Sequence, residues 1–209
     1  MDFGMKEAKM WLVQLNEQLQ KQKGYLTELD QNIGDGDHGL NMSRGFKEVI
    51  KIIEPTTYND LGSLFQDVGK TLLFKVGGAS GPLYGTVFLR IATSLKNKQE
   101  IGKTEIENAL QSALEGIKVR GKANLGDKTM VDVWEPILHY LQTKKEDSNW
   151  DEVILLAKEK MEQTKEIEAK KGRAAYLGKR SIGHIDPGAA SSCYFFVTLA
   201  TIFKGVEEN

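Results

Sequence analysis

Apolar residues recur at every third or fourth position along most of this chain, with polar residues between them. This spacing is typical of amphipathic helices. The first such helix has its apolar side at Ala8, Trp11, Leu12, Leu15 and Leu19, and Gly24 is expected to end it. A second helix is predicted from Asp37 to Ile53, with Pro55 beyond its end. Its apolar side is formed by Leu40, Phe46, Val49, Ile50 and Ile53.

The middle of the chain predicts three more helices. Asp60 is a suitable cap for a third helix that continues through Leu72. Pro82 fits the first position of a fourth helix, which reaches Leu95. The segment from Thr104 to Glu107 has the form of a capping box and opens a fifth. The apolar positions of this fifth helix are Ile106, Ala109, Leu110, Ala113 and Ile117.

The last three predicted helices complete the fold class. The sixth carries apolar residues from Val131 to Leu141, and Pro136 should kink it or mark its first turn. The seventh runs from Trp150 to Ile167, with Ser148 or Asn149 as its cap, and the eighth, 187–203, is apolar almost all round, as in a buried central helix. No convincing alternating strand is present. We therefore predict an all-α fold: a barrel or bundle of about eight antiparallel helices, forming one domain over residues 1–209.

Composition narrows the classes of function. A chain of 209 residues is long enough for one well-packed core. A net charge of -1 argues against nucleic acid or an anionic membrane as the main partner. The N-terminus lacks the features of a signal peptide, and no apolar run reaches the roughly 18 residues needed to cross a bilayer. The single Cys193 lies in an apolar run, which favours a buried structural thiol in a reducing, cytoplasmic setting.

The stretch from Asp30 to Asn41 is the strongest candidate for chemistry. Asp30, Asp35 and Asp37 are interleaved with glycines and followed at once by His38. Glycines allow tight turns in which carboxylates converge, and converging carboxylates repel unless a cation lies between them. Oxygen ligands without a thiolate suit Mg²⁺ or Ca²⁺. Since Asp and Gly are also ordinary turn residues, an acidic surface turn remains an equal alternative from the residues alone.

Three familiar motifs fail in this chain. Residues 34–39 match the pattern G-x-G-x-x-G, but no strand-like run precedes them, as a dinucleotide site requires. An EF-hand that starts at Asp35 would need Glu where Phe46 stands. A phosphate-binding loop ending in Gly69-Lys70-Thr71 would need an earlier glycine where Leu64 stands.

Three further connections are rich in glycine. Residues 77–82 directly precede a helix and could bind an anion, although a tight turn capped by Ser80 explains them as well. Residues 120–130 contain cations and glycines and could equally be a polar connector. Residues 172–188 form a long connection, which is often functional. Within it, His184 and Asp186 could be a catalytic pair, but a helix cap and turn contacts explain them better.

The order of the helices places these connections together. If neighbouring helices are antiparallel, alternate connections lie at the same end of the bundle. The connections near positions 35, 80, 125 and 180 follow the first, third, fifth and seventh predicted helices. One rim therefore gathers glycines, aspartates and cations. This arrangement predicts a site for a phosphorylated ligand bound through a divalent metal.

Four segments, in this order, resemble the ADP-binding L subunits of bacterial dihydroxyacetone kinases. They are Gly34-Asp-Gly-Asp-His-Gly39, Gly77-Gly-Ala-Ser-Gly-Pro82, Gly126-Asp-Lys-Thr-Met130 and Tyr176-Leu-Gly-Lys-Arg-Ser-Ile-Gly-His-Ile-Asp-Pro-Gly188. The resemblance covers nearly the whole chain, and the fourth segment is highly specific. It implies a barrel of eight antiparallel helices with the nucleotide at one rim.

The resemblance also implies which residues bind the ligands, and assigns no catalytic residue to this chain. Asp30, Asp35 and Asp37 are expected to hold two Mg²⁺ ions that bridge the phosphates of ADP or ATP. Ala79 and Ser80 belong to a phosphate loop, and Arg173 offers a cation. The full expected nucleotide set is His38, Gly39, Leu40, Asn41, Ala79, Ser80, Gly121, Met130, Arg173, Asp186, Pro187 and Gly188.

In such kinases the L subunit passes a phosphoryl group to dihydroxyacetone bound on a separate K subunit. In one branch the bound ADP stays in place and is rephosphorylated by a phosphoprotein, the M subunit. In another branch the same domain is fused to the K domain and exchanges ATP. The length of this chain favours the first branch. Two other hypotheses stay open: a nucleotide-loaded regulator that docks on a transcription activator, and a metal-stabilised helical protein without nucleotide.

Overall fold

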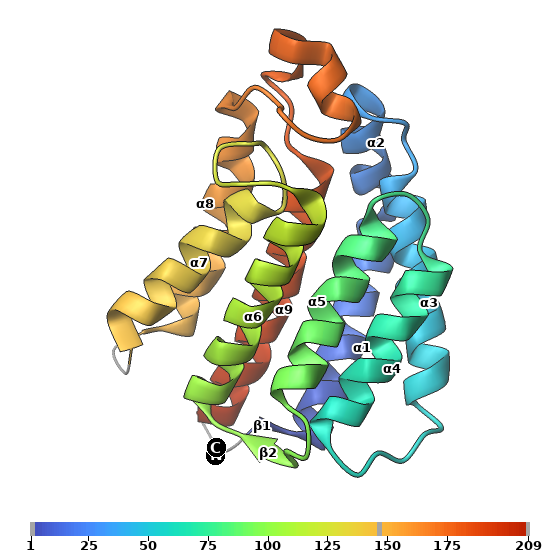
Figure 1. Ribbon diagram of the computed structural model, residues 1–209, viewed down its shortest axis with the longest axis vertical. Helices are drawn as coiled ribbons and strands as arrows, with labels where there is room; N and C mark the ends of the chain where they lie inside the picture. The colour runs from blue at the N-terminus through green and yellow to red at the C-terminus, as the bar shows by residue number, and fades with distance from the viewer. Residues whose placement is uncertain (1–2, 146–147, 208–209) are drawn as a thin grey trace.

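The computed structural model describes residues 3–145 and 148–207, and its chain is folded mainly into helices (Figure 1). The predicted domain over 1–209 includes residues 1–2, 146–147 and 208–209, which lie outside the described part. The long helices are α1 (Met5–Lys21), α2 (Lys23–Ile33), α3 (His38–Ile53), α4 (Leu61–Lys75), α5 (Ser80–Ser94), α6 (Lys103–Gly121), α7 (Val131–Lys144), α8 (Trp150–Gln163) and α9 (Pro187–Glu207). Two short 3₁₀ helices, η2 (Thr164–Glu166) and η3 (Arg173–Ser181), precede α9.

The predicted all-α class is confirmed, with one small addition. Strand β1 (Phe3–Gly4) pairs antiparallel with β2 (Glu100–Ile101), so that Phe3 lies opposite Ile101. This two-residue ladder ties the start of the chain to the loop before α6. It is too short to show the alternation by which strands are recognised in a sequence.

The first predicted helix corresponds to α1, and it is followed by α2, which the pattern did not predict. The helical path breaks at Gln22, between α1 and α2, and Gly24 lies in the first turn of α2 instead of ending a helix. A Cβ at Gly24 would meet nothing within 4 Å, so no packing requirement explains this glycine. The break has a consequence for the site: Asp30 lies in the last turn of α2 and not in a loop.

The core is organised around α9, which contacts α1, α2, α7 and α8. In Figure 1, α9 (red) passes behind α6 through the middle of the molecule. Its Phe195 packs against Trp11 of α1 and Trp134 of α7, each with ring centroids 4.8 Å apart. Aromatic pairs at such distances add to the energy of burial. The buried central role predicted for this helix is therefore confirmed.

The same helix passes a simple test for membrane spans. Residues Pro187–Val206 have a mean hydropathy of 1.4, and 67% of that stretch is buried inside the protein. The sequence has no uninterrupted apolar run of that length, because serine, threonine and glycine interrupt the apolar residues of this stretch. Burial against four other helices is what a central core helix of a folded domain requires, so its composition is weak evidence for a membrane.

Several helix boundaries differ from those predicted. Helix α5 begins at Ser80, two residues before Pro82. Helix α6 is opened by Gly102 and Glu105, whose Oε2 accepts the Gly102 N–H at 3.1 Å, and not by the predicted pair Thr104 and Glu107. Pro136 lies inside α7. These shifts of one or two residues leave the buried faces unchanged.

The second and seventh predicted helices also need correction. Leu40, expected on the apolar side of its helix, is 48% exposed. Helix α8 ends at Gln163, and the chain continues through η2 where the pattern predicted helix up to Ile167. Asn149 caps α8 by accepting the Asp151 N–H at 2.7 Å, which decides between the two expected caps.

Asp60 is the cap of α4, as predicted, and its Oδ1 accepts the Ser63 N–H at 2.6 Å. We expect Asp60→Ala to lower the free energy of unfolding by about 1 kcal/mol, because an orphan N–H group of the first turn loses its acceptor. Urea denaturation followed by circular dichroism measures the change. Asp60→Asn keeps an accepting oxygen and should remain close to wild type, and an equal loss in both variants would contradict the capping role.

Candidate functional site

Four connections meet at one end of the helix bundle, the upper end in Figure 1. They are the α2–α3 turn, the α4–α5 turn, the α6–α7 loop and the segment that precedes α9. Residues from all four line a pocket of about 550 Å³. This size is ordinary for a site that binds a small molecule. The rim predicted from the alternation of helix directions is therefore present.

Four of the nine long helices in the described part of the chain begin at this pocket. The starts of α3, α5, α7 and α9 contribute His38, Ser80, Val131 and Pro187 to its lining. The first N–H groups of a helix have no partner within the helix, and the helix dipole is positive there. Four such ends around one pocket make it suitable for a polyanion.

The three aspartates converge at the same place. One carboxylate oxygen from each of Asp30, Asp35 and Asp37 lies within 4.8 Å of the others. Such an all-oxygen set suits Mg²⁺ or Ca²⁺. Asp30 is 8% exposed, and its Oδ2 accepts the backbone N–H groups of Asp37 at 2.8 Å and His38 at 3.0 Å. Asp30 therefore also fixes the turn that carries Asp37.

Two glycines are required by close contacts in this region. A Cβ at Gly34 would lie 2.1 Å from Asp30 Oδ1, so a side chain there would displace the carboxylate. A Cβ at Gly39 would lie 2.2 Å from the carbonyl oxygen of Lys23 on α2. Gly39 thus allows α3 to approach α2. The donor set, whose Asp30 carboxylate is left undisplaced by Gly34, fits a bound divalent cation.

A cation from the chain itself also lies here. The Arg173 guanidinium Nη2 is 2.9 Å from Asp35 Oδ2, and the two side chains are 69% and 36% exposed. Arg173 comes from the start of η3, the segment that covers the rim in Figure 1. An exposed pair of this kind contributes little to stability. The Arg173 side chain is thus within reach of the aspartate cluster.

His38 lies in the wall of the pocket and is 7% exposed. Its Nδ1 is 2.8 Å from Ser80 Oγ and its Nε2 is 3.0 Å from Ser191 Oγ. Burial lowers the pKa of His38 to about 4, while the nearby Asp37 acts weakly in the opposite direction. The ring is therefore neutral near pH 7, and each nitrogen faces a hydroxyl group.

Lys128 joins the third connection to the fourth. It is 1% exposed, and its Nζ donates to the carbonyl oxygens of Thr164 at 2.7 Å, Ile167 at 3.2 Å and His184 at 2.5 Å. All three ammonium hydrogens are thereby used. Burial lowers the pKa of Lys128, and Asp186 and Asp132 act in the opposite direction. Lys128 belongs to the motif of residues 126–130, but no role was predicted for it from the sequence.

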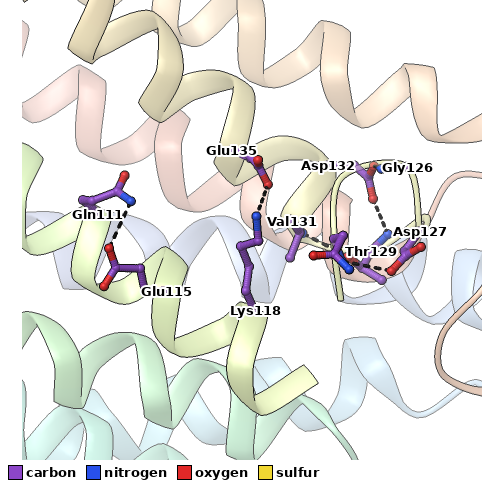
Figure 2. Close-up of polar contacts among 10 residues, drawn as sticks. Gln111, Glu115, Lys118, Gly126, Asp127, Thr129, Val131, Asp132 and Glu135 are labelled. Carbon is purple, nitrogen blue, oxygen red and sulfur yellow. Dashed lines mark hydrogen bonds and ion pairs between the residues drawn. The ribbon is translucent and has the colours of Figure 1, made fainter. Parts of the chain in front are cut away.

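The α6–α7 loop is held in shape by a carboxylate at the start of α7. Figure 2 shows Asp132 accepting the N–H of Gly126 at 2.6 Å, and its other oxygen accepts the N–H of Thr129 at 2.7 Å. Burial raises the pKa of Asp132. Figure 2 also shows Lys118 of α6 paired with Glu135 of α7 at 2.8 Å. This pair borders a separate groove of about 870 Å³ between α6, α7 and α8, which contains no predicted site residue.

Asp186 is the cap of α9. Its Oδ2 accepts the Ala189 N–H at 2.7 Å, and its own N–H donates to Thr164 Oγ1. His184 contributes a backbone carbonyl to Lys128, so the capping interpretation of this pair is the one that the structure favours. Burial raises the pKa of Asp186 to about 7, with smaller effects from Ala189, Asp132, Lys128 and Asp30.

This raised pKa predicts a dependence of stability on pH. The unfolded carboxyl titrates near 4, so the folded chain binds the extra proton between pH 4 and 7 and loses stability as pH rises through that window. Asp186→Asn keeps the accepting oxygen and removes the titration. We expect its unfolding free energy, relative to wild type, to rise by about 2 kcal/mol from pH 5 to pH 8. Urea denaturation without metal or nucleotide at both pH values tests this, and parallel pH profiles would contradict it.

The structure brings most of the predicted residues together but not all. Those that line the pocket are Asp30, Asp35, Asp37, His38, Ala79, Ser80, Gly121, Met130, Arg173, Asp186, Pro187 and Gly188. Gly39, Leu40 and Asn41 lie outside it. Gly39 packs on α2, Leu40 is exposed to solvent, and Asn41 Oδ1 accepts from Arg44 at 3.1 Å. The expected contacts of all these residues with a nucleotide stay predictions.

Comparison with known proteins places this chain. Residues 32–201 match the model of the DAK2 domain. The chain belongs to the DAK2 domain family. It is 45% identical over 189 residues to the ADP-binding subunit DhaL of PEP-dependent dihydroxyacetone kinase 1 from Listeria innocua, covering 90% of this chain and 92% of that one. It is also 45% identical to the ADP-binding subunit DhaL of the PTS-dependent dihydroxyacetone kinase from Lactococcus lactis, over 92% and 94% of the two chains.

A solved structure has the same fold. The dihydroxyacetone kinase from C. freundii, in complex with AMP-PNP and Mg²⁺, matches this DAK2 domain with a TM-score of 0.71 and 25% identity. The match covers 94% of this chain and 33% of that one, so this chain spans a third of the length of that kinase. The predicted helical fold of this family is confirmed.

Proposed function

We propose that this DAK2 domain is the nucleotide-binding subunit of a dihydroxyacetone kinase. It holds ADP or ATP together with Mg²⁺ and transfers the phosphoryl group to dihydroxyacetone, which is bound on a separate K subunit. Its class is therefore a phosphotransferase with an alcohol group as acceptor. The observation that carries the proposal is the convergence of three aspartates on a pocket at which four helices begin.

In this proposal the aspartate cluster and the helix N-termini around the pocket bind the same ligand. Asp30, Asp35 and Asp37 would hold the Mg²⁺, for which two ions are expected, and bound Mg²⁺ neutralises charge on phosphate oxygens. The N–H groups that open α5 and the Gly188 N–H of α9 would bind the remaining phosphate oxygens, since Pro187 has no N–H and the Ala189 N–H donates to Asp186. Leu83, Ile117 and Met130 line an apolar part of the same pocket and suit the adenine ring.

Phosphoryl transfer by this mechanism requires little covalent chemistry from the residues of this chain. Phosphoryl transfer depends mainly on in-line positioning and on neutralisation of charge. The residues around the pocket position the phosphates, and Arg173 adds a cation that already lies beside Asp35. The general base for the acceptor hydroxyl would come from the K subunit. For this reason no catalytic residue is assigned here.

The donor in this proposal is a phosphoprotein, the M subunit, which rephosphorylates ADP while it stays bound. Support comes from sequence identity: the subunits named as PEP- or PTS-dependent are 41–45% identical to this chain, whereas the C. freundii kinase is 33% identical over 190 residues. Such a subunit would act in the cytoplasm, and neither nucleic acid nor a membrane takes part.

The first experiment is to denature the purified protein and identify the nucleotide that it releases by chromatography. About one ADP per chain that survives extensive dialysis supports a tightly bound coenzyme and the phosphoprotein donor. An empty protein that is stabilised by ATP or ADP only with Mg²⁺ points to exchange of free nucleotide. If neither nucleotide nor Mg²⁺-dependent stabilisation is found, the proposal is wrong.

A further inference from the structure

A chain of buried, hydrogen-bonded side chains runs beneath the pocket and joins α3, α5, α7 and α9. Its successive distances are 3.0 Å from His38 Nε2 to Ser191 Oγ, 2.7 Å from Ser191 Oγ to Tyr84 Oη, 3.2 Å from Tyr84 Oη to Ser192 Oγ, and 3.0 Å from Ser192 Oγ to Trp134 Nε1. All of these residues are buried. At the other side of the His38 ring, Nδ1 faces Ser80 Oγ at the start of α5.

The number of hydrogens sets the direction of the bonds around Ser191. Its Oγ contacts the Gly188 carbonyl oxygen at 3.1 Å as well as Tyr84 and His38, but it carries one hydrogen. For all three contacts to be hydrogen bonds, Ser191 must donate to Gly188, because a carbonyl oxygen can only accept. Ser191 must then accept from both of its other neighbours. His38 Nε2 therefore carries a hydrogen.

The far end of the chain agrees with this direction. The indole N–H of Trp134 can only donate, so Ser192 accepts from it. The Ser192 hydroxyl can then donate to Tyr84 Oη, and the Tyr84 hydroxyl donates to Ser191. With this assignment every donor among His38, Ser191, Tyr84, Ser192 and Trp134 has an acceptor. This is the expected state of a polar network inside a protein.

The direction of these hydrogen bonds also determines how His38 bonds to Ser80 at the edge of the pocket. A neutral ring that carries its hydrogen on Nε2 has a lone pair on Nδ1, and that lone pair accepts the Ser80 hydroxyl hydrogen. The single hydrogen of Ser80 is thereby turned away from the pocket. Towards a ligand, Ser80 Oγ then offers only lone pairs.

We propose that Ser191 and Tyr84 are positioning residues that hold His38 as its Nε2–H tautomer and so present Ser80 to the pocket as a hydrogen-bond acceptor. Ser80 Oγ would accept from a donor group of the ligand, such as a hydroxyl or a metal-bound water, and would not bind a phosphate oxygen. Phosphate oxygens would be left to the backbone N–H groups of α5. The statement about the ligand rests on the proposed function, whereas the tautomer is a property of the free chain.

The tautomer can be measured directly. The chain has three histidines, so ring ¹⁵N spectra are simple, and His38 is identified as the signal lost in His38→Gln. We expect the wild-type ring to carry its hydrogen on Nε2 in the ligand-free protein at pH 7.5. A hydrogen on Nδ1 would overturn the proposal, whatever the outcome of nucleotide binding.

Ser191→Ala tests the positioning role. The variant removes the acceptor of the Nε2 hydrogen, so His38 should shift to the Nδ1–H tautomer and donate to Ser80. Loss of one well-placed acceptor is expected to weaken binding of ADP with Mg²⁺ about tenfold in calorimetry. Ser191→Thr keeps the hydroxyl and should restore both the tautomer and the affinity.

Thr198→Ala is the matched control, because Thr198 is also a buried hydroxyl on α9 and bonds only to backbone carbonyls there. It should change neither measurement. A wild-type tautomer in Ser191→Ala overturns the role of Ser191, and an altered tautomer with unchanged affinity overturns the statement about Ser80. If wild-type protein has the Nε2–H tautomer but binds no nucleotide, the proposed function fails while the assignment of the network stands.

Discussion

The double variant Asp35→Asn, Asp37→Asn is expected to lose Mg²⁺-dependent binding of ADP while it stays folded. Two of the three converging carboxylates become neutral, and a cation site made of hard anionic oxygens loses most of its charge. We expect the dissociation constant for ADP in the presence of Mg²⁺ to rise at least about a hundredfold. Calorimetry with and without Mg²⁺ measures the change, and circular dichroism reports the fold.

Asp30 is left intact in this test for a structural reason. Its Oδ2 accepts two backbone N–H groups of the following turn, so Asp30→Asn would disturb the turn as well as the metal site. Within the described residues, the Asp35 side chain has only its exposed pair with Arg173, and removing that pair costs little. Relief of repulsion among the three carboxylates acts in the other direction. The free energy of unfolding without metal should therefore change by less than about 1 kcal/mol.

The control must change the net charge equally without touching the cluster. Glu17→Gln with Glu28→Gln does so, since both side chains are exposed, on α1 and α2 respectively. This control should bind ADP as wild type does. Equal binding by the aspartate variant and the control, with an unchanged requirement for Mg²⁺, would refute the metal assignment.

The fold was predictable because burial follows periodicity over long helices. Trp11, Leu15 and Leu19 repeat at helical spacing and are all buried against the core. Once eight antiparallel helices are expected, the parity of their connections places the glycine-rich segments at one rim. That step needs neither distances nor side-chain conformations. It depends only on helix length and order.

Other features were not predictable because the signal is local or ambiguous. Gly24 was expected to end the first helix, but it lies in the first turn of α2, so Asp30 was assigned to a loop although it ends a helix. Leu40 has an apolar side chain but faces solvent. Ser191 and Ser192 are two adjacent polar residues in a buried apolar helix, and that contrast is the sequence signal by which the network under the pocket could have been noticed.

Lys128 shows why contacts between distant segments cannot be predicted from the sequence alone. Its side chain reaches the carbonyl oxygens of residues 36, 39 and 56 positions further along the chain. A lysine in a glycine-rich connection is usually exposed, and its neighbour in the same loop, Lys122, is exposed indeed. The backbone does not distinguish the two lysines either, because both have the left-handed conformation, with φ of 59° for Lys128 and 50° for Lys122. The difference lies wholly in what the fold places next to them.

This pair gives a matched test of the role of Lys128. Lys128→Met keeps the length and apolar part of the side chain but leaves three carbonyl oxygens without their donor. An unsatisfied buried acceptor costs about 1–3 kcal/mol, and water can replace part of the loss because two of the three bonds are only partly buried. We expect the free energy of unfolding to fall by about 3 kcal/mol. Lys122→Met carries the same change at the same backbone conformation and should stay within about 0.5 kcal/mol of wild type.

Hydrogen exchange distinguishes a local from a global effect of Lys128→Met. The ammonium group holds the segment 164–184 against the α6–α7 loop, and within this segment the Gly183 N–H donates to Lys165 O at 2.7 Å. We expect exchange in peptides from residues 164–186 to accelerate well beyond that of α5. Since Arg173 reaches the pocket from this segment, and Asp186 and Pro187 directly follow it, ADP binding should weaken as well. If hydrogen exchange accelerates uniformly across the chain, Lys128 contributes to overall stability and does not specifically hold the segment 164–184 against the α6–α7 loop.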